Sequence, residues 1–146
     1  MKRIYRNINL KNRNSFGVVQ HAATLVEVES ADDLRDYFIA EQPTKWYVLG
    51  GGNNILFTQD YDGVLISPRS ERMELIAEDT EGVTLRVDAG KVWDELVEWS
   101  VGEGLWGIEN LSAIPSSVGA APVQNIGAYG AEAKDVITVV EYFDTE

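Results

Sequence analysis

Residues 49–57, with the sequence LGGGNNILF, have the types and spacing that could bind a phosphate group. The three glycines at 50–52 lack a Cβ atom, so their backbone amides can approach a ligand closely. Successive amides of this kind form a concave nest that suits pyrophosphate oxygens without a lysine. The segment lacks the G-K-[ST] ending of a triphosphate loop and the G-x-G-x-x-G of a dinucleotide fold. A second interpretation stays open, in which the glycines only form a tight turn and Asn53 and Asn54 bond to their own backbone.

Residues 113–130, AIPSSVGAAPVQNIGAYG, form the second segment with chemical potential. Its small residues permit close approach, and hydroxyls at Ser116 and Ser117 stand with amides at Gln124 and Asn125. Such paired donors and acceptors can satisfy the polar edge of a heterocycle, as in loops that wrap a cofactor. The alternative is a structural loop packed on a sheet, with a tyrosine at 129 as an amphipathic anchor.

The composition excludes several other kinds of site. The 146 residues include no cysteine and one histidine, which excludes disulfides, thiolate nucleophiles and histidine or cysteine metal clusters. The net charge of −12, from 24 acidic and 12 basic residues, repels nucleic acids, so any phosphate must be bound locally by backbone amides. No apolar run approaches the roughly 20 residues of a membrane span, and residues 1–6 lack the apolar stretch of a signal peptide. We therefore expect a soluble, cytoplasmic protein without nucleic-acid, membrane or metal partners.

Other polar and aromatic residues have plainer interpretations. His21 is expected at a loop or strand end and receives no role. The acidic residues between 71 and 81 are expected on the solvated face of a hairpin rather than in a metal site. Core packing is the favoured interpretation for the four tryptophans, Trp46, Trp93, Trp99 and Trp106.

The two segments must be positioned by regular elements, and apolar periodicity indicates them. In the first half we expect a strand at 24–29, a helix that Ser30 caps with Asp33 three residues on and that Pro43 ends, and a strand at 46–49. This strand–helix–strand order, followed by the glycine turn, is βαβ-like. Further elements are expected as a strand at 64–66, a hairpin of 73–77 with 83–87, a helix at 91–103 stopped by Gly104, short turns at 105–129, and a strand at 136–143.

The two segments resemble motifs of one family. LGGGNNILF resembles the phosphate loop of UDP-N-acetylenolpyruvoylglucosamine reductases, where L-G-x-G-S-N-x-L-x is typical. Residues 107–132, GIENLSAIPSSVGAAPVQNIGAYGAE, resemble that family's second flavin-binding stretch, and the long pattern IPxxVGAxxxQNIGAYG is the specific match. NSFG at 14–17 is similar to the family's N-T-F-G. The resemblance is collinear from residue 14 to about residue 144.

Three residues depart from the family pattern. Asn53 stands where serine is usual, and Ser15 replaces threonine. Asparagine offers a side-chain hydrogen bond as serine would. Ser116 replaces a common glycine, so a positive φ at that position would strain the serine or rearrange the loop.

The resemblance implies an α+β architecture, a two-part FAD-binding fold of the vanillyl-alcohol-oxidase type. Residues 1–68 would form a small α/β subdomain with the phosphate loop. Residues 69–146 would form a second subdomain with a mixed or antiparallel sheet and flanking helices. The chain stops where a turn would be expected, without a linker, so we expect this second subdomain to be truncated at its C-terminal end.

Site residues follow from the resemblance position by position. Seven residues would lie at the pyrophosphate of a noncovalently bound FAD: Gly50, Gly51, Gly52, Asn53, Asn54, Ile55 and Leu56. Nine residues would lie along the flavin and adenosine portions: Ile114, Pro115, Ser116, Ser117, Gly119, Ala120, Gln124, Asn125 and Gly127. Tyr129 matches a family tyrosine near the substrate cleft and serves there as a substrate contact or as a wall residue.

The family reaction supplies the expected function. NADPH reduces FAD, and the reduced flavin passes a hydride to UDP-N-acetylglucosamine enolpyruvate, which gives UDP-N-acetylmuramate for peptidoglycan, and so for cell-wall formation, cell shape and division. The family's catalytic arginine, serine and glutamate lie in later motifs, expected beyond Glu146, so no catalytic residue is predicted in this chain, which should be inactive alone. Two alternatives stay open: another FAD oxidoreductase of the same fold, and a noncatalytic nucleotide-binding module. Covalent flavin attachment is disfavoured because the chain lacks cysteine and has one ill-placed histidine.

Overall fold

The computed structural model describes residues 1–145, which form two compact units. The first unit contains Met1–Ser70 and the described residues from Phe143 onward. The second unit contains Glu71–Tyr142. Each unit combines strands with helices, as the sequence predicts for an α+β protein. The division into FAD-binding subdomains after residue 68 stays a prediction.

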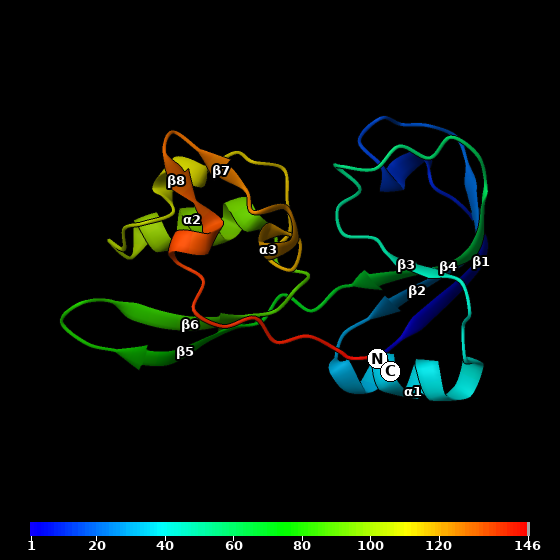
Figure 1. The fold of residues 1–146 in the computed structure, drawn as a ribbon, viewed down its shortest axis with the longest axis horizontal. Helices are drawn as coiled ribbons and strands as arrows, with labels where there is room; N and C mark the ends of the chain where they lie inside the picture. The colour runs from blue at the N-terminus through cyan, green and yellow to red at the C-terminus, as the bar shows by residue number, and fades with distance from the viewer. Residues whose placement is uncertain (146) are drawn as a thin grey trace. The chain divides into compact units, whose positions relative to one another are not determined.

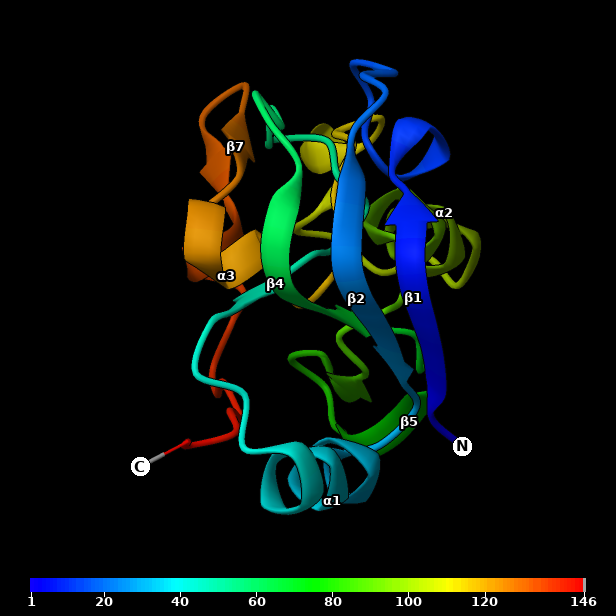
Figure 2. The same cartoon turned by 90° about the vertical axis from the view of Figure 1, so that its right-hand side faces the viewer.

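The first unit is built on a four-stranded mixed sheet. Its elements are β1 (Arg3–Asn9), η1 (Lys11–Arg13), β2 (His21–Val28), α1 (Ala31–Glu41), β3 (Trp46–Val48) and β4 (Tyr61–Pro68). The strand order is β1-β2-β4-β3, with β1 antiparallel to β2 and the other two pairings parallel. Figure 2 shows β1, β2 and β4 side by side. The predicted strand–helix–strand order is confirmed, and β4 lies between the two parallel strands that α1 connects.

The two faces of this sheet bury different partners because side chains alternate along β2. Leu25 packs on one face with Leu49 and Phe57, the two ends of the glycine-rich segment, which are 3% and 6% exposed. Val26 packs on the other face with Tyr37 of α1. Figure 1 shows α1 on one side of the sheet and the loop that follows β3 on the other. Both ends of the loop are therefore anchored in the core on the face opposite α1.

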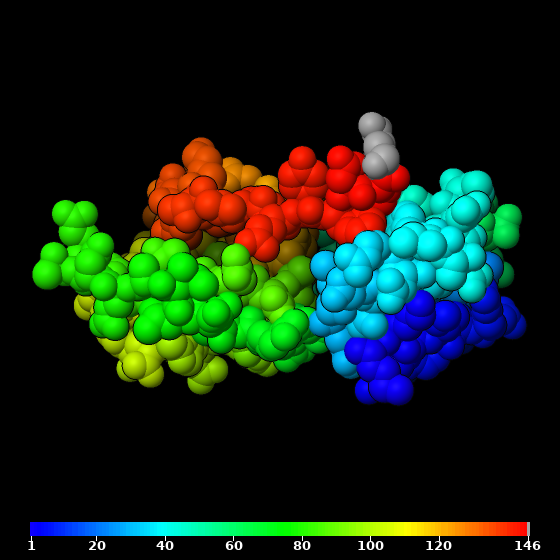
Figure 3. All heavy atoms as spheres, turned by 90° about the horizontal axis from the view of Figure 1, so that it is seen from below, coloured from blue at the N-terminus to red at the C-terminus, as the bar shows by residue number. Residues whose placement is uncertain are grey.

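Helix α1 begins and ends close to where the sequence predicts. The Ser30 hydroxyl accepts a hydrogen bond from the Asp33 amide at 3.0 Å, which satisfies one free donor of the first turn. The return bond of a capping box goes elsewhere, since the Asp33 carboxylate accepts from the Glu29 amide at 3.2 Å. The helix ends at Glu41, and its left-handed C-cap residue Gln42, with a φ of 43°, stands directly before Pro43. Its outer surface, in light blue, is exposed in the view of Figure 3.

The second unit packs a hairpin, helices and short turns around one apolar cluster. Its elements are β5 (Met73–Glu78), β6 (Val83–Val87), α2 (Trp93–Gly102), η2 (Glu109–Leu111), α3 (Ala121–Gln124), β7 (Gly127–Ala128), β8 (Ala131–Glu132) and η3 (Ala133–Asp135). The predicted hairpin is confirmed, and the Asp79 carboxylate accepts the amides of Glu81 and Gly82 in its turn, at 2.8 and 3.0 Å. Trp93 of α2, 3% exposed, is central to the cluster and donates from its indole Nε1 to the Leu111 carbonyl at 3.0 Å.

The predicted stop of α2 at Gly104 is confirmed. Gly104 has a φ of 72°, and its amide donates to Val101 O at 3.0 Å. The next amide, of Leu105, donates to Ser100 O at 2.8 Å. This bond pair is a Schellman motif, which satisfies the last carbonyls of the helix and favours glycine at the left-handed position.

Two expectations about this unit are wrong. Residues 136–143 form no strand within the described chain, although their apolar residues suggest one. The amides of Val136 and Ile137 donate to Ala133 O and so close η3, while Tyr142 further along is 84% exposed. Core packing is confirmed only for Trp93 among the four tryptophans: Trp106 is 87% exposed, and Trp46 and Trp99 are each 38% exposed and belong to no buried cluster.

None of the helices formed by residues 1–145 has the length and hydropathy that a bilayer span requires.

Candidate functional site

The glycine-rich loop is held against the N-terminal segment by its carbonyls. Gly52 is buried with a φ of 72°, and a Cβ built on it would lie 2.0 Å from the Arg13 carbonyl oxygen. The Ser15 amide donates to Gly52 O at 3.1 Å, and the Ser15 hydroxyl donates to Asn53 O at 3.3 Å. Gly50 and Gly51 are exposed, and among the described residues their amides donate no hydrogen bond. The loop thus directs carbonyls into the protein and leaves glycine amides accessible to a ligand.

Asn14 fixes the segment that holds the loop. It is 7% exposed, and its Nδ2 donates to Leu10 O at 2.7 Å and to Val18 O at 3.2 Å. Its Oδ1 accepts from the Val18 amide at 3.1 Å. The first residue of the NSFG sequence is therefore a structural clamp, and Ser15 beside it reaches the glycine loop.

The second motif pairs with the chain that enters α2. Trp93 N donates to Ser116 O at 3.0 Å, and Gly119 N donates to Ala89 O at 3.0 Å. The backbones come so close that a Cβ built on Gly119 would lie 2.6 Å from the Ala89 Cβ. Only glycine fits this approach without movement of its neighbours.

The condition for strain at Ser116 is not met, because Ser116 is not among the residues with positive φ. Ala113, at the start of this segment, is left-handed, with a φ of 59°. The Asp94 carboxylate holds it, accepting the Ala113 amide at 2.6 Å and the Ser112 hydroxyl at 2.9 Å. These two hydrogen bonds lower the pKa of Asp94 from its ordinary value. Sequence reasoning missed Asp94, whose signal was only an acidic residue in the first turn of a helix.

The end of the second motif is a small hairpin with internal polar contacts. Asn125, with a φ of 44°, donates from Nδ2 to the Glu132 carboxylate at 2.6 Å and accepts the Lys134 amide at 3.2 Å. The ammonium of Lys134 and the Asn125 amide lower the pKa of Glu132. The Asn125 side chain is therefore engaged on its nitrogen by Glu132 at the end of the hairpin and on its oxygen by Lys134 in η3. Its predicted contact with a heterocycle stays a prediction, as does that of Gln124.

Tyr129 lies at the tip of the hairpin β7–β8. It has a φ of 53° and Gly130 has a φ of 84°, the pattern of a two-residue turn with both residues left-handed. The tyrosine side chain is 92% exposed. The turn thus presents a phenol to solvent on a backbone fixed by the strand pairing, and its contact with a substrate stays a prediction.

The structure brings each predicted set together within its own unit. The seven residues predicted at the pyrophosphate lie in one loop of the first unit, where Ile55 packs beside the core and Leu56 is 57% exposed. The residues predicted along flavin and adenosine lie in the second unit, where Ile114 packs against the α2 core. Their contacts with a cofactor stay predictions.

The loop chemistry fits a diphosphate. No acidic side chain occurs at residues 49–57, and exposed glycine amides offer partial positive charge to phosphate oxygens. The described part of the chain contains no group of three metal-ligating side chains.

The His21 amide donates to the Asp60 carboxylate at 2.7 Å, and the imidazole Nδ1 lies 3.8 Å from the same carboxylate.

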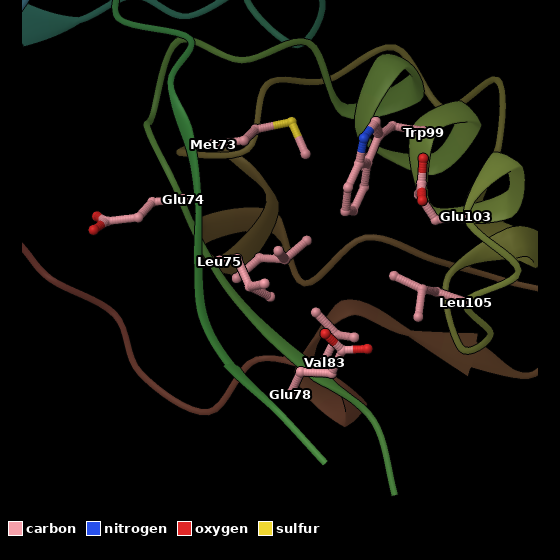
Figure 4. A pocket seen from close by; sticks show the side chains of 9 residues that line it. Met73, Glu74, Leu75, Glu78, Val83, Trp99, Glu103 and Leu105 are labelled. Carbon is pink, nitrogen blue, oxygen red and sulfur yellow. The ribbon is translucent and has the colours of Figure 1, made fainter. Parts of the chain in front are cut away.

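A separate cavity of about 330 Å³ lies in the second unit, between the hairpin β5–β6 and the end of α2. Figure 4 shows Met73 and Trp99 facing each other across it, with Leu105 and Glu103 beside the indole. None of the residues predicted to bind the cofactor lines this cavity. It is therefore distinct from the two glycine-rich segments.

The chain is similar in sequence to known FAD-binding proteins. A family model described as an FAD binding domain matches residues 22–146. UDP-N-acetylenolpyruvoylglucosamine reductase from Bacteroides fragilis (strain YCH46) is 44% identical over 139 residues, which covers 94% of this chain and 42% of the relative. The enzyme of the same name from Neisseria gonorrhoeae is 43% identical over 148 residues, which covers 100% of this chain and 43% of the length of that enzyme.

A solved structure agrees with the sequence comparisons. The crystal structure of UDP-N-acetylenolpyruvylglucosamine reductase from Thermus caldophilus matches with a TM-score of 0.71 and 30% identity, over 90% of this chain and 46% of that chain. The chain thus spans about four tenths of the length of the curated relatives it matches. The resemblance identified from the two motifs and the predicted α+β FAD-binding fold are both confirmed.

Proposed function

Because the chain belongs to the FAD-binding domain family, we propose that it is the FAD-binding part of an oxidoreductase that reduces UDP-N-acetylglucosamine enolpyruvate with NADPH. The product would be UDP-N-acetylmuramate, a precursor of peptidoglycan. The observation that carries this proposal is the similarity to UDP-N-acetylenolpyruvoylglucosamine reductases along 94% of the chain, which includes both glycine-rich segments. The proposal places the protein in the cytoplasm, with small-molecule partners and no nucleic-acid or membrane partner.

The residues of the first unit would hold the diphosphate of FAD. Ser15 draws the carbonyls of Gly52 and Asn53 inward, so the amides of Gly50 and Gly51 can donate to phosphate oxygens. The net charge of −12 repels a diphosphate, so the chain needs local donors such as these backbone amides to hold it. A preorganised loop also binds with less loss of conformational entropy than a mobile one.

The second motif would line the flavin and adenosine portions. The backbone pairing at Ser116 and Gly119 fixes its course, and Asp94 fixes its start at Ala113. Tyr129 at the hairpin tip would lie toward the substrate cleft. When bound, FAD supplies hydride transfer between NADPH and the enolpyruvyl double bond. The chain's own residues bind and orient the cofactor.

Reduction of the substrate also needs groups that stabilise charge and donate a proton. We place the arginine, serine and glutamate that do this in the part of the reductases that this chain does not span. The chain alone should therefore bind FAD without catalysing the complete reaction.

A titration of the 146-residue chain with FAD, followed by flavin fluorescence and visible absorbance, tests the binding. An assay of NADPH oxidation with UDP-N-acetylglucosamine enolpyruvate tests the rest. We expect saturable FAD binding without turnover. A colourless full-length protein that does not take up added FAD would favour a noncatalytic module, and substantial turnover by the 146-residue chain would refute the split between binding and catalysis.

A further inference from the structure

A buried carboxylate in β2 joins three side chains of the first unit. Glu27 is 5% exposed, and its Oε1 accepts from Arg13 Nη1 at 2.6 Å and lies 3.1 Å from Arg69 Nη2. Its Oε2 accepts from the Tyr5 hydroxyl at 3.2 Å. Burial opposes ionisation of Glu27, but the hydrogen bond from Arg13 and the charges of Arg69 and Arg13 outweigh it and keep the pKa of this carboxyl below its usual value. The group is therefore a charged anchor at neutral pH.

Arg13 connects this anchor with the glycine loop. Its side chain is 26% exposed and reaches Glu27, with the guanidinium 5.9 Å from the centre of the Tyr5 ring. Its carbonyl oxygen occupies the space where a side chain of Gly52 would begin. Two residues later, Ser15 donates to the carbonyls of Gly52 and Asn53. One short segment thus contacts the buried charge with a side chain and the loop with its backbone.

We infer that Glu27 is a positioning residue for the diphosphate loop, acting through Arg13. It anchors the Arg13 side chain, and the attached backbone sets the position of the Gly52 and Asn53 carbonyls. This inference rests on the proposed function only for the identity of the ligand. Arg69 is 48% exposed and has no described backbone contact with the loop, so it supports the charge of Glu27 without setting the loop.

The amide of Ser15 is a local reporter of this contact, because it donates to Gly52 O. Its hydrogen exchange, measured by NMR in the chain without FAD, rises when the segment leaves the loop. The Val64 amide, which donates to Lys45 O at 3.0 Å in the same unit, reports whether the sheet itself has loosened. A purely structural role for Glu27 would increase exchange at both amides.

We expect Glu27→Gln and Arg13→Met each to speed exchange of the Ser15 amide about tenfold, which equals about 1.4 kcal/mol, and to weaken FAD binding by a similar factor. Exchange at Val64 should stay unchanged. The double variant should be no weaker than Arg13→Met alone, because both changes break one connection. Arg13 is partly exposed, so its variant tests the same contact even if Glu27→Gln unfolds.

Two variants serve as controls. Arg69→Met removes the other guanidinium and should change either measurement less than about threefold, as for a partly exposed ion pair. Glu74→Gln makes the same chemical change at an exposed glutamate, 3.7 Å from Arg86, and should change neither. Unchanged Ser15 exchange in both primary variants, or additive effects in the double variant, would overturn the inference. Failure of the full-length protein to bind FAD would instead refute the proposed function, and the exchange result, which is measured without FAD, would still decide the positioning role.

Discussion

Substitution of Gly52 by alanine should break the loop that we propose binds the diphosphate. The added methyl meets two costs, since φ is 72° and the new Cβ would lie 2.0 Å from the Arg13 carbonyl oxygen. A left-handed conformation costs a non-glycine residue about 1–2 kcal/mol. Overpacking against a fixed backbone costs about 1–3 kcal/mol more. We therefore expect Gly52→Ala to lower the free energy of unfolding by about 2–5 kcal/mol, as the sum of the two terms.

Gly104 provides a matched control for the conformational cost. Its φ is also 72°, but a Cβ built there meets no atom within 4 Å. Gly104→Ala should cost only the left-handed term, about 1–2 kcal/mol. The difference between the two variants therefore isolates the contact with Arg13.

Urea unfolding followed by circular dichroism measures both variants, and an FAD titration of each folded variant measures the consequence for binding. Gly52→Ala should lose FAD affinity, while Gly104→Ala should retain it. Equal destabilisation by the two substitutions would refute the close packing of Gly52 on Arg13. Full FAD affinity in Gly52→Ala would refute the role of the loop conformation.

Three further predictions concern other contacts. Gly119→Ala should destabilise the chain by about 2 kcal/mol, and Ala89→Gly in the same chain should recover part of this loss in urea unfolding, since the two Cβ atoms would lie 2.6 Å apart. Hydrogen bonds from Ala113 and Ser112 hold the pKa of Asp94 below its ordinary value of 3.8, so the ionised carboxylate stabilises the fold above that pH. Asp94→Asn should therefore lower the melting temperature above pH 3.8, and the difference from the unsubstituted chain should shrink as the pH falls further and the carboxylate becomes protonated. A difference independent of pH would contradict this. Ser30→Ala should cost about 1 kcal/mol by thermal unfolding, as expected when an N-cap hydroxyl is lost, and no change would contradict the observed cap.

Much of the first unit follows from local sequence signals. Ser30 and Pro43 bracket α1, and the apolar run at β3 ends at the glycines, so helix and loop could be predicted from short-range chemistry. Strand β1 was missed because its sequence, RIYRNIN, is mostly charged or polar. It is an edge strand paired only with β2, and such strands tolerate exposed polar residues. Its pairing is long-range and leaves little local pattern.

The second unit shows the opposite error. Residues 136–143 have the apolar composition of a strand, but a strand also needs a partner for its amides and carbonyls. The amides at the start of the segment bond to Ala133 O instead, so the pattern alone was misleading. The roles of Asp94 and Glu27 were likewise invisible in the sequence. Each depends on a partner that folding brings near: the Ala113 backbone amide, 19 residues from Asp94, and the Arg13 guanidinium, 14 residues from Glu27.

The central claim is that the amides of the triple glycine bind a diphosphate. The most direct measurement is an NMR titration of the labelled chain with FAD, with ADP, and with adenosine as the control that lacks a diphosphate. We predict saturable shifts of the Gly50 and Gly51 amide resonances with FAD and with ADP, and none with adenosine. Shifts confined to other residues, or equal shifts with adenosine, would contradict the account.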